Sequence, residues 1–261
     1  MDCLQKKAHF RICSVGFFRL MIRFNHQLFI MTNSLVQTFA YYIFFSLLSL
    51  GCSEATREIS EQDMRKEKKS GEVFKILILG DSLTEGYGVM EQEAFPYLLE
   101  IKLNQELAPK TGLFYQVING GISGSTSSGG VSRIEWFIQA KPDFLILALG
   151  GNDGLRGISV DETKKNLSLI LKTAHERNIS TLLAGMKIPP NYGFAYTESF
   201  SQMYFELAKN HDTSLLPFLL KGVGGNPKKN LPDRIHPNPA GHEIIAENVF
   251  QHLSKILSAL P

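Results

Sequence analysis

Residues 73–83, VFKILILGDSL, join a short apolar run to a tight turn. The run, residues 73–79, has the length and apolar content of a strand that is buried on both faces of a parallel sheet. Gly80 suits a turn that a side chain would crowd. On such a strand-to-helix turn, Ser82 would be lifted out of the sheet edge, with its own N–H beside the carbonyl that its oxygen attacks. The alternative is that Ser82 only caps the following helix, since Gly-Asp-Ser is a common turn sequence.

The alternation of apolar runs and helical patterns continues along the chain. Buried strands are also predicted at residues 114–118, 144–149 and 180–186, with a short one at 214–216. Helices are predicted at residues 95–107, 131–139, 161–177, 198–210 and 239–257, with Asp161 as the N-cap of the third. Strands that alternate with helices indicate an α/β fold, in which helices cover both faces of a parallel sheet. Ligands bind such sheets beyond the carboxyl ends of the strands, so reactive residues should follow the strands.

Polar and glycine-rich segments do follow the next two predicted strands. Residues 119–126, NGGISGST, would present backbone N–H groups to an anion or an oxyanion. A phosphate cradle is the rival interpretation, but the GK[ST] and G-x-G-x-x-G patterns are missing. Asn152, in the Gly-Gly-Asn-Asp segment after the third strand, can donate its side-chain N–H into the same cleft. Ordinary turn chemistry is the alternative for this segment.

Asp233 and His236 lie three residues apart in DRIHPN, just before the last predicted helix. This spacing lets the carboxylate accept a hydrogen bond from one ring nitrogen, which leaves the other nitrogen as a base toward Ser82. The remaining histidines precede the domain or fall in or beside predicted helices. They are therefore expected to be surface or packing residues: His9, His26, His175, His211, His242 and His252.

With these four blocks in this order, the chain resembles the SGNH or GDSL hydrolases, whose name lists Ser, Gly, Asn and His. ILGDSLTEGYG, NGGISGSTS, LGGNDGLRG and DRIHPN are most similar to the bacterial multifunctional thioesterase/lysophospholipase branch, which includes arylesterases. The resemblance covers about residues 74–256. It implies a three-layer α/β/α fold with a flavodoxin-like, five-stranded parallel sheet. It also implies a serine esterase that hydrolyses carboxylic ester or thioester bonds through an acyl-enzyme.

Carried over by position, the resemblance implies Ser82 as the nucleophile, His236 as the base and Asp233 as the residue that orients it. The oxyanion hole would consist of the Ser82 N–H, the Gly124 N–H and the Asn152 side chain. Asp81 belongs to the same motif, but no catalytic role is assigned to it. No metal or organic cofactor is expected, and the sequence offers no cluster of metal ligands.

Apolar residues flank the predicted cleft and suit an acyl chain or an aryl group, with plain packing as the alternative: Leu155, Tyr192, Phe194, Leu216 and Phe218. The expected substrate is therefore a small acyl ester or a lipid. A carbohydrate O-acetyl esterase would use the same reactive residues on a sugar acetate. A non-catalytic surface binding module on a hydrolase scaffold is a further, weaker alternative.

The first 52 residues differ from the rest of the chain. They carry five basic residues and one acidic residue, whereas residues 53–261 carry 22 and 24. The larger part is thus nearly neutral, which argues against nucleic-acid binding. Residues 39–50, FAYYIFFSLLSL, lie between basic residues and Gly51-Cys52, as in a bacterial lipoprotein signal that would leave Cys52 lipidated. An uncleaved membrane anchor and a buried structural helix are the alternatives.

The chain is accordingly divided into a signal or anchor segment at residues 1–52, a charged tether at residues 53–72 and a hydrolase domain at residues 73–261. The tether has mixed charge and no core-forming pattern. We expect a monomeric, exported bacterial protein that is periplasmic or is held at the membrane by its N-terminal segment.

Overall fold

The computed structural model describes residues 71–259. The predicted signal or anchor segment, Cys52 and nearly all of the predicted tether lie outside these residues. Within residues 71–259, no helix is both long enough and apolar enough to cross a membrane.

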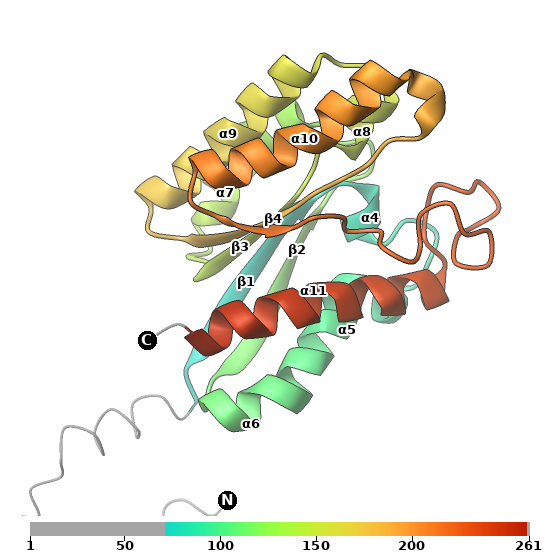
Figure 1. Cartoon of the computed structure of the whole chain (residues 1–261). Coiled ribbons are helices and arrows are strands. Elements are labelled where there is room, and N and C mark those ends of the chain that lie inside the picture. Colours follow the sequence, from blue (N-terminus) through green and yellow to red (C-terminus); the bar gives the residue numbers. More distant parts are fainter. Residues whose placement is uncertain (1–70, 260–261) are drawn as a thin grey trace, which may run out of the picture. The chain divides into compact units, whose positions relative to one another are not determined.

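The described residues form a five-stranded, all-parallel sheet with the strand order β2-β1-β3-β4-β5 (Figure 1). The strands are β1 (Val73–Gly80), β2 (Phe114–Gly121), β3 (Phe144–Ala148), β4 (Ser180–Ala184) and β5 (Ser214–Leu216). The predicted three-layer α/β/α fold is confirmed, and the strand order is the flavodoxin-like one. Because the order reverses between β1 and β3, the loops after these central strands diverge to opposite faces and leave a crevice at the carboxyl edge.

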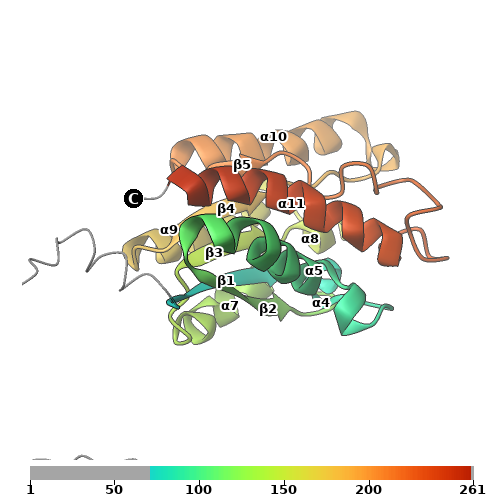
Figure 2. The same cartoon turned by 90° about the horizontal axis from the view of Figure 1, so that it is seen from below.

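Helices cover both faces of the sheet. Helices α5 (Phe95–Lys102), α6 (Ala108–Thr111) and α11 (Pro239–Ala259) lie on the face seen in Figure 2. Helices α7 (Ser127–Ile138), α9 (Val160–Glu176) and α10 (Phe194–Asn210) cover the other. Short helices lie between these elements: α4 (Ser82–Glu85), η1 (Glu91–Glu93), the π-helix η2 (Leu103–Leu107), α8 (Gly151–Leu155) and η3 (Pro190–Tyr192). Residues 76–79 of β1 and all of β3 are buried, as expected for strands between two helical layers.

Several predicted boundaries are wrong by a few residues. β2 extends to Gly121, so residues 119–121 belong to the strand and pair with Ile78–Gly80 of β1. α7 begins at Ser127 instead of residue 131, and α10 at Phe194 instead of residue 198. The helical segment that starts at Phe95 continues through η2 and α6 to Thr111.

The predicted N-cap Asp161 is also wrong, because Ser159 caps α9 by accepting a hydrogen bond from the Glu162 N–H at 3.2 Å. Asp161 lies instead in the first turn of that helix.

Candidate active site

Ser82 is placed by the turn that ends β1. It is the first residue of α4, and Asp81 caps this helix by accepting a hydrogen bond from the Leu83 N–H at 3.0 Å. The alternative that Ser82 is itself the cap is therefore wrong. Gly80 is required at this turn, because a Cβ there would lie 1.9 Å from Thr84 Oγ1. The turn leaves Ser82 at the carboxyl edge of the sheet, where its side chain meets the loop before α11.

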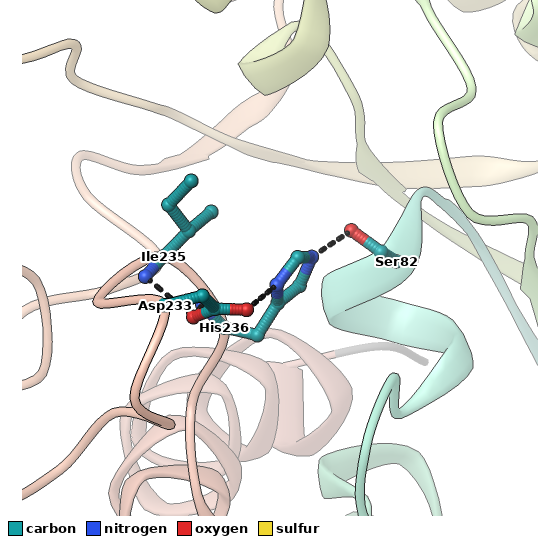
Figure 3. Close-up of polar contacts among 4 residues, drawn as sticks. All are labelled: Ser82, Asp233, Ile235 and His236. Carbon is teal, nitrogen blue, oxygen red and sulfur yellow. Dashed lines mark hydrogen bonds and ion pairs between the residues drawn. The ribbon is translucent and has the colours of Figure 1, made fainter.

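That loop brings Asp233 and His236 to Ser82 (Figure 3). His236 Nε2 lies 3.0 Å from Ser82 Oγ, and His236 Nδ1 lies 2.7 Å from Asp233 Oδ2. With the carboxylate accepting from Nδ1–H, Nε2 is left unprotonated and faces the serine hydroxyl. The distances between these side chains are therefore short enough for His236 to take the proton of Ser82 as a general base.

Asp233 is held as an anion by its own loop. Its Oδ1 accepts hydrogen bonds from the backbone N–H groups of Ile235 at 2.9 Å and His236 at 3.0 Å. Arg234 between them adopts a left-handed conformation with φ of 61°. Burial alone would raise the pKa of Asp233, but these two N–H groups and the His236 ring lower it to about 2. The carboxylate can therefore orient the imidazole over the whole working pH range of a hydrolase.

Three potential oxyanion donors lie on the loops that follow β1, β2 and β3. Gly124 has a φ of 74° in the segment between β2 and α7, which we call the Gly124 loop (residues 122–126). Among the described residues, no acceptor is found for the N–H of Ser82 or of Gly124. Asn152 Nδ2 donates to the Ser125 carbonyl at 3.1 Å and lies 3.4 Å from Asp81 Oδ2. The Asn152 amide thus joins the Gly124 loop to the turn that carries the serine.

The arrangement of these residues agrees with the match of this chain to a known protein family. The sequence model of the GDSL-like lipase/acylhydrolase family matches residues 78–244, which span the serine turn, the Gly124 loop, Asn152 and the Asp233–His236 pair. The chain belongs to this family. It is therefore an acyl hydrolase, an enzyme that cleaves ester or thioester bonds.

Relatives of this GDSL hydrolase match nearly the whole described domain. "Esterase TesA" of Pseudomonas aeruginosa is 37% identical over 183 residues, which cover 70% of this chain and 89% of that protein. "Thioesterase 1/protease 1/lysophospholipase L1" of Escherichia coli K12 is 38% identical over 184 residues, 70% of this chain and 85% of that protein. The psychrotrophic esterase EstA from Pseudoalteromonas sp., solved in a form inhibited by monoethylphosphonate, superimposes with a TM-score of 0.65 at 31% identity. That superposition covers 70% of this chain and 98% of EstA.

The apolar residues predicted to contact substrate lie in different surroundings. Tyr192 and Leu155 lie together, because the Tyr192 hydroxyl donates to the Leu155 carbonyl at 2.8 Å. Phe194 is 84% exposed at the start of α10. Phe218 is half-buried, with Lys187 Nζ 5.6 Å from its ring centroid. Leu216 differs from the others, since it is buried in β5 and belongs to the core, so the packing alternative holds for it.

Asp81 is a buried acid to which the sequence assigned no role. Burial raises its pKa to about 6, although the Leu83 N–H and the electrostatic influence of His236 and Arg133 oppose this shift. Arg133 also donates to the Gly80 carbonyl at the end of β1. The position of Asp81 next to Ser82 in the sequence predicts that the two residues lie close together. Its burial could not be predicted in this way, because it depends on contacts with α7 and α8.

Two further side chains at the site were missed. The ring of Tyr87 lies 4.4 Å from the His236 ring, centroid to centroid, at an angle of 40°. Asp153 is buried and accepts hydrogen bonds from the Ser127 backbone N–H at 2.8 Å and from the Ser127 hydroxyl at 2.5 Å. Both contacts join residues far apart in the sequence, and no local sequence pattern predicts them.

The histidines outside the site include one buried side chain, His242 on α11, whose Nδ1 accepts from the Phe95 N–H at 3.2 Å. It is a packing residue, as expected. Residues 71–259 contain no group of three or more His, Cys, Asp or Glu side chains that could hold a metal ion.

Proposed function

We propose that Ser82, His236 and Asp233 form the catalytic triad of a serine esterase that works through an acyl-enzyme. The observation that carries this proposal is the pair of contacts at His236, 3.0 Å to Ser82 Oγ and 2.7 Å to Asp233 Oδ2. A histidine placed between a carboxylate and a hydroxyl is the arrangement that nucleophilic acyl transfer requires.

The first half of the reaction acylates the enzyme. As Ser82 Oγ attacks the acyl carbonyl carbon, its proton passes to His236 Nε2, and Asp233 stabilises the resulting imidazolium. The tetrahedral intermediate then collapses, the C–O or C–S bond breaks, and His236 returns the proton to the departing alcohol or thiol. Water attacks the acyl-Ser82 ester in the same way and releases the carboxylic acid.

The negative charge of the tetrahedral intermediate requires donors that are already in place. The Ser82 N–H, the Gly124 N–H and the Asn152 side chain fill this role in our proposal. The two backbone groups have no acceptor within the described residues, which leaves them available to the substrate. Loss of one such donor costs on the order of 3–4 kcal/mol of transition-state stabilisation.

The proposed substrates are lysophospholipids and small aryl or alkyl esters. Apolar side chains on the loops after β3 and β4 support this choice, because Leu155, Tyr192 and Phe194 offer exposed apolar surface at the carboxyl edge. Relatives named esterase, thioesterase and lysophospholipase support esters, thioesters and lysophospholipids as the classes of substrate.

We also propose that the protein is exported and lipidated at Cys52, which follows from residues 39–52 of the sequence. Acyl-CoA would then be an improbable natural substrate, because it would be absent where the enzyme acts. Incorporation of labelled fatty acid into the wild-type protein and its loss in Cys52→Ser would test this proposal.

The test of the triad is hydrolysis of p-nitrophenyl esters from acetyl to palmitoyl by the wild type and by Ser82→Ala. Ser199→Ala, at an exposed serine on α10, is the matched control. We expect Ser82→Ala to lose turnover at every chain length and Ser199→Ala to keep it. A p-nitrophenyl ester of monoethylphosphonate should phosphonylate Ser82 Oγ of the wild type with release of p-nitrophenolate, and should leave Ser82→Ala unchanged in mass. Full turnover by Ser82→Ala would refute the proposal, and activity on acetyl esters alone would favour a carbohydrate O-acetyl esterase.

A further inference from the structure

Three residues in and directly after α8 hold the Gly124 loop and the start of α7, and we call them the α8 clamp (Asn152, Asp153 and Arg156). Asn152 Nδ2 donates to the Ser125 carbonyl at 3.1 Å. Asp153 accepts from the Ser127 N–H at 2.8 Å. The clamp therefore fixes the chain on the C-terminal side of Gly124 by two contacts.

The third contact reaches Gly124 itself. Arg156, the C-cap of α8, donates from Nη2 to the Gly124 carbonyl at 2.9 Å. Of the described residues, only Arg156 donates to this carbonyl. The guanidinium also lies against the backbone here, because a Cβ added to Gly124 would be 3.4 Å from Arg156 Nη2.

Gly124 depends on such a restraint more than another residue would. Glycine has the widest range of backbone conformations, so its own covalent structure does not fix the direction of its N–H. Its N–H and its carbonyl flank the same Cα. A restraint on the carbonyl therefore limits the backbone rotations that would reorient the N–H.

We propose that Arg156 is a positioning residue for catalysis, which holds the Gly124 N–H in the direction that oxyanion binding requires. This inference rests on the proposed role of Gly124 in the oxyanion hole. Arg156 itself need not touch the substrate. Its contribution should consequently appear in the transition state and not in the affinity for the ester.

Two other roles for Arg156 predict different kinetics. Its exposed positive charge could act on the oxyanion through space, but salt would weaken such an effect, since the Debye length is about 10 Å at 0.1 M ionic strength. A direct contact with the substrate in both ground and transition states would raise KM and leave kcat unchanged.

The first experiment compares Arg156→Met, which keeps an unbranched apolar stem without the guanidinium, with Arg156→Lys, which keeps a single charged donor group. For Arg156→Met we expect kcat and kcat/KM to fall together by about 10- to 30-fold, a partial loss of the 10²–10³-fold effect of one oxyanion donor. KM should stay within about twofold, and the deficit should be the same from 0.05 to 0.5 M salt. Arg156→Lys should recover part of the loss. Arg177→Met is the control, because Arg177 is also exposed and pairs only with Glu135 among the described residues.

The second experiment is a double-mutant cycle with Gly124→Ala. If Arg156 acts through Gly124, then Arg156→Met should lower kcat by less than about threefold in the Gly124→Ala background, because the donor is already displaced. If the two losses of kcat multiply in the double variant, the inference about Arg156 is overturned while the proposed oxyanion hole stands. The same conclusion follows if Gly124→Ala lowers kcat and Arg156→Met does not. Gly124→Ala keeps the N–H, so the role of this donor is tested with Gly124→Pro, which lacks it: if Gly124→Pro keeps full kcat, the role of Gly124 is itself refuted, and the inference about Arg156 fails with it.

Discussion

Acidification from pH 7 to pH 5 should destabilise the folded protein through His242. This side chain lies fully buried on α11 against the start of α5, where its Nδ1 accepts a hydrogen bond from the Phe95 N–H at 3.2 Å. Its Nε2 is buried without a partner among the described residues. A proton on Nδ1 would abolish the hydrogen bond to Phe95 and place a charge between two packed helices, so the folded protein favours the neutral ring.

The size of the effect follows from the pKa of His242. Burial is the main cause that lowers this pKa from 6.5 to about 4; the nearby Glu93 opposes the shift and His236 adds to it. Because the pKa is lower in the folded state, the unfolded chain binds the proton first as the pH falls through 6.5. Stability is then lost progressively until the pH drops below about 4. Between pH 7 and pH 5 the loss should be roughly 2 kcal/mol, at 1.36 kcal/mol per pKa unit.

Urea unfolding at pH 7 and pH 5 would measure this loss in the wild type and in His242→Asn. The Asn side-chain oxygen lies at about the position of Nδ1 and can still accept from the Phe95 N–H, but it does not titrate. Asp81 acts in the opposite direction, because its raised pKa makes the folded state relatively more stable as the pH falls through about 6. That effect is common to both proteins, so the difference between them isolates His242. Equal pH dependence in the two proteins would refute the reasoning.

Substitutions at three further positions test other parts of the structure. Asp233→Asn should lower kcat by about 10²- to 10⁴-fold, since the amide no longer fixes the His236 tautomer; an effect below tenfold in steady-state ester hydrolysis would argue against the orienting role. Tyr87→Ala should lower kcat about 2- to 10-fold and Tyr87→Phe much less, because a ring pair at 4.4 Å contributes about 0.5–1.5 kcal/mol to holding His236; equal rates for the two variants would contradict this role. Gly121→Ala should destabilise the protein by about 2–3 kcal/mol in urea unfolding, because its Cβ would lie 2.1 Å from the Glu85 backbone nitrogen; wild-type stability would show that this approach can relax.

The sequence predicted the strands well because each contains a short apolar run, and those of β1 and β3 are buried between the two helical layers. It missed the end of β2, since Asn119 and Gly120 are typical turn residues and only the pairing with β1 keeps them extended. The start of α7 was missed for a similar reason. Residues 127–130, SSGG, have low helix propensity, and their helix is stabilised by Asp153 and by the close approach of Leu149 to Gly130.

In the proposed site, too, some contacts could be predicted from the sequence and others could not. Asp233 and His236 could be paired from sequence because they lie three residues apart on one loop. Their contact with Ser82 crosses 154 positions, but the rule that parallel strands end at one edge was enough to predict it. Tyr87, Asp153 and Arg156 follow no such rule. Their partners depend on where short helices and loops end in space, which single-sequence patterns do not determine.

The two ends of the described chain leave the domain on the side away from Ser82. β1 starts at Val73 and reaches the serine turn after eight residues, which is about 26 Å at ~3.3 Å per residue. Leu257 and Ser258, near the end of α11, line the same hollow as Glu72 and Val73. A resin, an electrode or a fusion partner joined at either end would therefore leave the entrance for esters facing open solution. We therefore expect attachment at either end of residues 71–259 to leave turnover unchanged.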